Sequence, residues 1–206
     1  MKLSPRDAAA YFRKPDPDRP GVLIFGQDPM RVALRRAEVV KALTGPAAEE
    51  EMRLTRLTGA DLRGDAAALI DAVKAIGFFP GPRAVVVEDA TETTLPALQA
   101  ALDDWRPGDA TLVVTAGALR KESKLRKLFE GHRTALAAAI YDDPPGRADV
   151  ERMLAEAGLP PPSRDAIDAL LALAQGMGPG DLTQLVAKIG LYKLGDPAPL
   201  TPADIA

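Results

Sequence analysis

Along the first two thirds of the chain, short apolar runs alternate with longer segments in which apolar residues recur at helical spacing. The runs are rich in β-branched residues and predict buried strands at residues 22–25, 52–57, 84–87, 111–115 and 134–140. The segments between them predict helices at residues 30–43, 66–76, 95–102 and 122–129. Strands that alternate with helices of this length form parallel sheets covered on both faces. We therefore predict an α/β fold with a five-stranded parallel sheet.

The strand pattern ends near residue 141, and the remaining sequence predicts helices only. They are expected at residues 149–157, 163–174 and 181–194, and Thr201 and Pro202 are typical of the start of one more helix. The opening segment, up to residue 21, is broken by prolines and is expected to lead into the first strand. The predicted organisation is an α/β domain at residues 1–141 and a small helical domain at residues 142–206.

Composition narrows the classes of function. The 206 residues are 47% hydrophobic, which is enough for a packed core, and the net charge of −3 argues against a chain that binds phosphate backbones over its whole surface. The absence of Cys excludes thiolate metal sites, and any His-dependent site would rest on His132 alone. Neither a membrane-spanning run nor a signal peptide is visible, so we expect a cytoplasmic protein with no membrane partner.

The first strand ends where nucleotide-binding α/β proteins place a phosphate loop, but the motifs of such a loop are missing. The chain contains no Gly-Lys pair and no G-x-G-x-x-G, and Asp28 brings a carboxylate to the place of a phosphate. Glu88 and Asp89 end a hydrophobic strand as Mg²⁺-binding acids do in ATPases. Without a phosphate loop, a buried strand that ends in solvated acids is the favoured interpretation. We expect no catalytic residue, cofactor, metal or small-molecule substrate.

Two adjacent aromatic residues, Phe78 and Phe79, follow Gly77 and precede Pro80-Gly81-Pro82. Side chains of adjacent residues diverge by about 100° on a helix and 180° on a strand, so one buried face cannot readily take both rings. The flanking Gly and Pro residues predict a loop, and exposed aromatic rings on a loop are typical of a protein-binding site. The alternative is that both rings fold over the edge of the sheet.

Residues 120–133 carry six Lys or Arg side chains against two Glu, and this local excess of positive charge could meet DNA or an acidic partner. The candidate contact residues are Arg120, Lys121, Lys124 and Lys127. The alternative is a solvated helix face whose apolar residues pack inward. His132 follows a Gly that should end this helix, and it is predicted to belong to the C-terminal cap.

Taken together, these segments resemble the delta subunits of the bacterial DNA polymerase III clamp loader, members of the AAA+ superfamily. The residues that carry the resemblance are 22–28, 77–79, 111–115, 119–125, 180–192 and 200–205. The resemblance implies a RecA-like α/β domain with a degenerate phosphate loop, a small helical lid domain, and a helical collar domain that would begin where this sequence ends. Through that missing collar, such subunits assemble with the other clamp-loader subunits.

The resemblance also implies a function. Delta subunits bind no ATP and open the ring-shaped sliding clamp, the beta subunit, by inserting a hydrophobic pair into a pocket of the clamp. Those positions match Phe78 and Phe79, flanked by Ile76 and Pro80. This sequence departs from the family pattern at two points. It has Phe-Phe where a Leu-Phe pair would be equally expected, and the Pro-Gly-Pro that follows is expected to stiffen the loop. We expect a non-catalytic component of the DNA polymerase III holoenzyme that contacts DNA indirectly or weakly.

Two other interpretations stay open. The chain could be an ATP-hydrolysing protein with a divergent phosphate loop. It could also be a DNA-binding module whose helical half places residues 181–194 in a groove. That segment carries only Lys188 and Lys193 as positive charges, which is few for groove binding with phosphate contacts.

Overall fold

The computed structural model describes residues 1–141 and 145–205. The chain divides into two compact units, with the division between residues 142 and 143. Each unit is described by itself below. The domain boundary predicted between residues 141 and 142 touches residue 142, which lies outside the described residues. Within the described ranges, no helix is long and apolar enough to cross a membrane.

The first unit is built on a five-stranded parallel sheet, as predicted. Its strands are β1 (Gly21–Gly26), β2 (Leu54–Thr58), β3 (Ala84–Glu88), β4 (Thr111–Ala116) and β5 (Leu136–Ile140). The strand order is β2-β3-β4-β1-β5, so β1 lies between β4 and β5. In this register Leu23 is opposite Val114 on one side and Ala137 on the other. The central strands are buried on both faces, which is why their sequences are continuous apolar runs.

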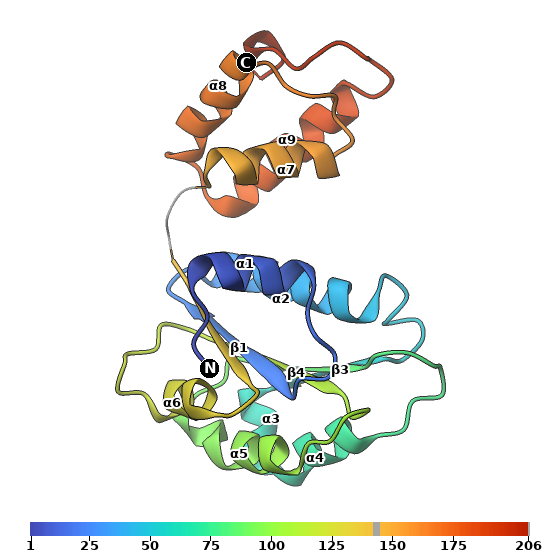
Figure 1. The fold of residues 1–206 in the computed structure, drawn as a ribbon, viewed down its shortest axis with the longest axis vertical. Coiled ribbons are helices and arrows are strands. Elements are labelled where there is room, and N and C mark those ends of the chain that lie inside the picture. Colours follow the sequence, from blue (N-terminus) through green and yellow to red (C-terminus); the bar gives the residue numbers. More distant parts are fainter. Residues whose placement is uncertain (142–144, 206) are drawn as a thin grey trace. The chain divides into compact units, whose positions relative to one another are not determined.

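Helices cover both faces of the sheet (Figure 1). One face packs against α1 (Pro5–Arg13) and α2 (Pro29–Thr44), and the other packs against α3 (Gly59–Gly64), α4 (Ala67–Lys74), α5 (Leu95–Asp104) and α6 (Lys124–Gly131). A 3-10 turn, η1 (Glu92–Thr94), leads into α5. Successive residues of β1 alternate between the two cores: Val22 and Ile24 face α1 and α2, whereas Leu23 and Phe25 face the other layer.

The structure differs from the sequence-based predictions in several elements, and it adds α3, which the sequence analysis did not predict. The opening segment contains α1, which begins with Ser4 as N-cap and Pro5 in the first turn, so it is more than a lead-in to the first strand. The strand predicted from residue 52 starts only at Leu54, because Met52 has a positive φ of 49°, which is incompatible with a strand.

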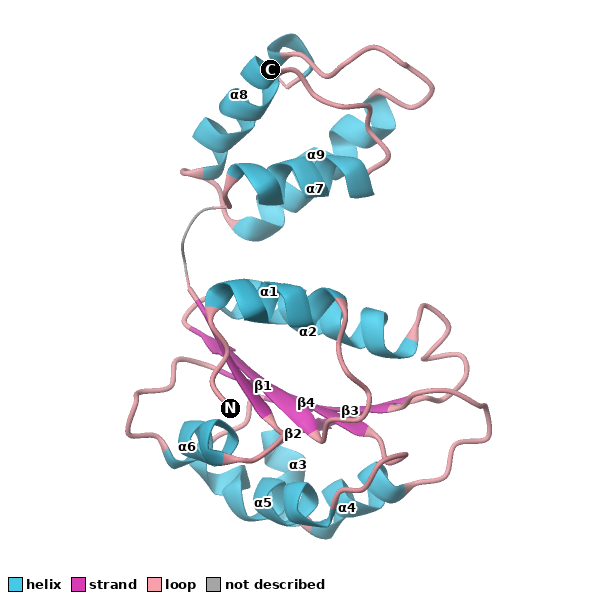
Figure 2. Cartoon of the chain, in the orientation of Figure 1, coloured by secondary structure: helices cyan, strands magenta, loops and turns pink. Residues whose placement is uncertain are grey.

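The second unit is helical, as predicted (Figure 2). It contains α7 (Arg147–Glu156), α8 (Arg164–Ala174), α9 (Pro179–Tyr192) and the single 3-10 turn η2 (Pro202–Asp204). Its core consists of Val150, Leu154, Leu159, Ala166, Leu170, Val186, Ile189 and Leu200. The start signal at Thr201 forms a capping box with Asp204, and the described chain continues from it for one 3-10 turn only.

Candidate functional site

The loop between α4 and β3 carries the aromatic pair. Phe78 is 87% exposed and Phe79 is 37% exposed, while Ile76 before them is 97% exposed and Pro80 after them is also exposed. The two rings pack edge to face, with centroids 5.3 Å apart and an interplanar angle of 78°. The loop therefore presents contiguous apolar side chains to solvent.

The position of this loop follows from the topology. The loop leads into the first residue of β3, so it lies at the amino-terminal ends of the parallel strands. The turn between β1 and α2, where the sequence analysis placed a degenerate phosphate loop, lies at the opposite, carboxyl ends of the strands. The alternative in which both rings fold over the sheet edge is wrong for Phe78, and Phe79 keeps more than a third of its surface exposed.

In the turn between β1 and α2, a carboxylate already occupies the N-terminus of the helix. Asp28 is the N-cap, and its Oδ1 accepts hydrogen bonds from Met30 N at 2.8 Å and Arg31 N at 3.2 Å. The Arg31 guanidinium also lies 3.4 Å from Asp28 Oδ2. Free amides at this position would attract a phosphate, but here they are capped by the protein's own anion.

The acidic end of β3 is engaged by arginines. Glu88 Oε1 lies 2.5 Å from Arg36 Nη1 of α2 and 3.8 Å from Arg56 Nη1 of β2. Arg56 in turn pairs with Glu49 at 2.6 Å. Glu88 is therefore one member of a surface ion-pair network, where the sequence predicted only a solvated acid. Asp89, the next residue, is exposed and has a positive φ of 53°.

The basic segment, residues 120–133, comprises the loop before α6, the whole of α6 and the two residues after it. Its four candidate contact side chains are exposed, and among the described residues none of them has an ion pair: Arg120, Lys121, Lys124 and Lys127. On the opposite side of the helix, Leu125 and Phe129 are fully buried. α6 is thus an amphipathic helix with a positively charged outer face.

Other polar residues of this segment serve the fold. Arg126 pairs with Glu130 at 2.8 Å and lies over the ring of Phe25, 5.2 Å from its centroid. Glu92 accepts a hydrogen bond from Ser123 Oγ at 2.6 Å, and this bond lowers the pKa of Glu92. These contacts join α6 to β1 and η1.

His132 is the C-cap residue of α6, which confirms its predicted place. Its Nδ1 accepts hydrogen bonds from Thr134 N at 3.2 Å and Ala135 N at 3.0 Å, and burial lowers its pKa. A neutral imidazole that accepts two backbone hydrogen bonds suits a structural role. In the part of the chain that the structure describes, no group of three or more potential ligand side chains could hold a metal ion.

On α9, one of the two lysines considered for DNA binding is unavailable. Lys193 has a side chain only 5% exposed, and its Nζ lies 2.6 Å from Asp196 and 3.7 Å from Asp204. The hydrogen bond to Asp196 raises the pKa of Lys193. Lys188 is exposed.

Comparison with known proteins adds evidence on the fold. No family model and no curated protein matches the sequence. Among solved structures, the chain is similar to the Bacillus subtilis DNA clamp loader delta protein (YqeN), with a TM-score of 0.64 and 16% identity over 97% of this chain and 60% of that one. It is also similar to domain III of the Thermotoga maritima replication initiation protein DnaA, with a TM-score of 0.51 and 13% identity over 98% of this chain and 90% of that one. At these identities the likeness shows the fold alone, which is a RecA-like α/β unit with a five-stranded parallel sheet followed by a helical unit.

Proposed function

We propose that this chain is a non-catalytic clamp-loader subunit that binds the sliding clamp and helps to open it for loading onto primed DNA. The observation that carries the proposal is the pair of exposed, mutually packed aromatic rings on the loop between α4 and β3. Exposed adjacent aromatics leave apolar surface in water, and proteins retain such surface where a partner covers it. The likeness of the fold to a clamp loader delta protein supports the choice of partner.

In this proposal Phe78 and Phe79 enter an apolar pocket of the clamp, and Ile76 and Pro80 contact its rim. Ring opening then follows from differential binding, because a protein shifts a closed-to-open equilibrium only by its difference in affinity for the two states. The chain spans 60% of the Bacillus subtilis delta protein. Assembly with other clamp-loader subunits, through a collar domain, is part of the same proposal.

Three features support a subunit that does not use ATP over a divergent ATPase. The amides of Met30 and Arg31 at the start of α2 already donate to Asp28, so a phosphate there would meet a like charge. Glu88 is paired with Arg36 in the position from which an ATPase would bind Mg²⁺. The sequence also has no lysine after a glycine to neutralise a terminal phosphate.

A weaker second contact is proposed for the loop before α6 and the basic outer face of that helix. Arg120, Lys121, Lys124 and Lys127 are exposed on one segment and suit a phosphate backbone or an acidic protein surface. The rival in which α9 binds a DNA groove has little support, because Lys193 is buried in ion pairs.

The test is a titration of this chain with the sliding clamp of the same organism. Binding that is lost in the double variant Phe78→Ala/Phe79→Ala supports the proposal, and its absence in the wild-type chain would refute it. Calorimetry with Mg-ATP separates the enzyme alternative, because micromolar affinity or turnover would show that the phosphate loop is functional.

A further inference from the structure

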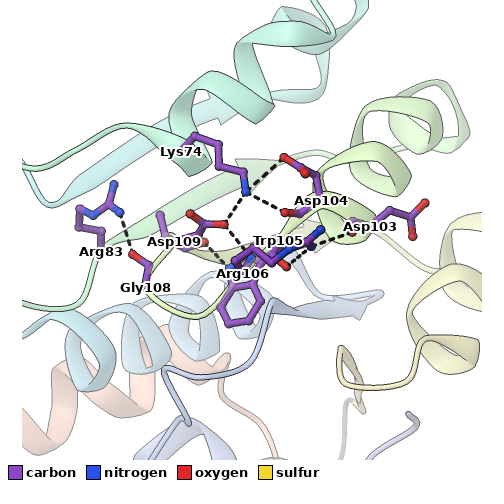
Figure 3. A network of polar contacts seen from close by, with 9 residues as sticks. Lys74, Arg83, Asp103, Asp104, Trp105, Arg106, Gly108 and Asp109 are labelled. Carbon is purple, nitrogen blue, oxygen red and sulfur yellow. Dashed lines mark hydrogen bonds and ion pairs between the residues drawn. The ribbon is translucent and has the colours of Figure 1, made fainter.

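We call residues 75–83, between α4 and β3, the aromatic loop. Its first end is held to the connection between α5 and β4 (Figure 3). Lys74, the last residue of α4, donates hydrogen bonds to the Asp104 carbonyl at 2.7 Å and to Asp109 Oδ2 at 2.8 Å. The bond to Asp109 raises the pKa of Lys74. Burial acts to raise the pKa of Asp109, but the hydrogen bonds from Lys74 and the Arg106 amide outweigh it, so that pKa is lowered. Both groups are charged at neutral pH.

The second end of the loop is held to the same connection. Arg83, the residue before β3, donates from Nη2 to the Gly108 carbonyl at 2.9 Å, and its own carbonyl accepts from Thr111 N at 2.9 Å. Asp109 also accepts from Arg106 N at 2.7 Å, which closes the turn at residues 106–109. One short turn therefore contacts the residues on both sides of the loop, as Figure 3 shows.

A third contact holds the second end from the other side. Arg53 Nη1 donates to the Pro82 carbonyl at 2.8 Å, and Arg53 is itself held by Glu51 through Nε at 2.7 Å. Gly81 has a φ of +121°, and a Cβ there would come within 3.3 Å of the Arg53 guanidinium. The loop approaches this arginine closely because residue 81 has no side chain.

Between these contacts the loop has no polar connection to the fold. Within residues 1–141 and 145–205, no hydrogen bond or ion pair joins residues 76–81 to other parts of the chain. Pro80 and Pro82 restrict its backbone, but its direction depends on how its two ends are held. The contacts of Lys74 and Arg83 are thus placed to control how the aromatic rings are presented.

We propose that Lys74, Arg83 and the turn at residues 106–109 form a loop clip, in which Asp109 is the positioning residue that keeps the aromatic loop ready to bind its partner. The clip deepens the proposed function and rests on it for the identity of that partner. A loop ordered before binding avoids the entropy cost of ordering on contact. Loss of the clip reduces the fraction of molecules with a competent loop, and the apparent affinity falls by the same factor.

The clip can be tested with Asp109→Ala in the full chain, with Asp103→Ala as the matched control. Asp103 lies on the same stretch of chain and carries the same charge, but its carboxylate binds Gln99 and does not contact Lys74. We expect Asp109→Ala to slow association with the clamp about tenfold, because fewer loops are competent. The dissociation rate should stay within about twofold, since the bound contacts are unchanged.

Three more variants separate positioning from general stability. Lys74→Met should reproduce the effect of Asp109→Ala, and Lys74→Arg should restore association, because arginine keeps a cation at this place. The double variant Lys74→Met/Asp109→Ala should be slowed by less than the product of the two single effects, because both single variants remove the Lys74–Asp109 hydrogen bond. Lys74→Met also replaces Asp109→Ala as the main test if that variant does not fold.

A readout without the clamp keeps the clip distinguishable from the proposed function. Chymotrypsin cleavage after Phe78, followed by mass spectrometry, should be about tenfold faster in Asp109→Ala than in Asp103→Ala, because cleavage follows the population of open loops. Cleavage after the exposed Tyr192 of the second unit provides an internal reference. Unchanged cleavage at Phe78, or association that Lys74→Arg does not restore, would overturn the clip. If the wild-type chain does not bind the clamp, the proposed function fails and the cleavage comparison still decides the clip.

Discussion

The double variant Phe78→Ala/Phe79→Ala tests the candidate site most directly, and the structure sets the size of its effect. Complete burial of a Phe side chain contributes about 1.5 to 3 kcal/mol. Phe78 has 87% of its surface free to be buried by a partner and Phe79 has 37%. Scaled by these fractions, the pair contributes about 2 to 4 kcal/mol to binding, or roughly one and a half to three orders of magnitude in affinity.

The same variant should leave the fold intact. Phe78 is 87% exposed and packs edge to face against Phe79, so its truncation belongs with surface changes of about 0.5 kcal/mol or less in the free energy of unfolding. Phe79 is more covered, and we expect its loss to cost about 1 kcal/mol. Core phenylalanines would instead cost about 3 to 5 kcal/mol each.

The assay pairs a clamp-binding titration with a melting curve of the double variant. We expect weak or undetectable binding and a melting temperature lowered by only about 2 to 6 °C. Unchanged clamp affinity in a well-folded variant would remove these residues as the binding site. A collapsed melting temperature would show that the rings support the fold.

Three further predictions concern the rest of the first unit. Lys121→Glu, Lys124→Glu and Lys127→Glu together should weaken contact with DNA or an acidic partner at low salt and leave the melting temperature almost unchanged; a large loss of stability would make α6 purely structural. Calorimetry should detect no Mg-ATP binding at micromolar concentrations, because Asp28 caps the amides of α2. Burial raises the pKa of Tyr11 to about 12, and its hydroxyl has no hydrogen-bond partner among the residues that the structure describes. From about pH 10 to 12 the unfolded chain loses this proton before the folded chain does, so stability should fall by up to about 1.4 kcal/mol per pH unit, and Tyr11→Phe should remove that fall in alkaline denaturation curves.

The sequence by itself determined the fold class. Strands covered on both faces must be apolar throughout, and runs such as residues 22–25 and 84–87 can satisfy that requirement only in the middle of a covered sheet. The missed helix α1 had a readable signal, since Ser4, Pro5 and Asp7 are an N-cap, a first-turn proline and a first-turn acid. The left-handed backbone at Met52 had none, because methionine rarely adopts a positive φ.

The candidate site was only half determined by the sequence. Gly77 and Pro80-Gly81-Pro82 indicate a loop, and the order of residues indicates which side chains it carries. Whether Phe78 is buried depends on whether the core has room for its ring. In the folded unit the positions beside the sheet are filled by side chains of α3, α4, α5 and α6, so the ring remains in solvent.

Tertiary structure alone decided how that loop is held. Lys74 and Asp109 are 35 residues apart, and Arg83 and Gly108 are 25 residues apart, with no local pattern that pairs them. They meet because β3 and β4 are neighbours in the sheet, which brings the end of α4 and the start of β3 against the turn before β4. Contacts between ordinary surface residues become specific only after the apolar strands have set the strand order, and local sequence signals do not encode that order.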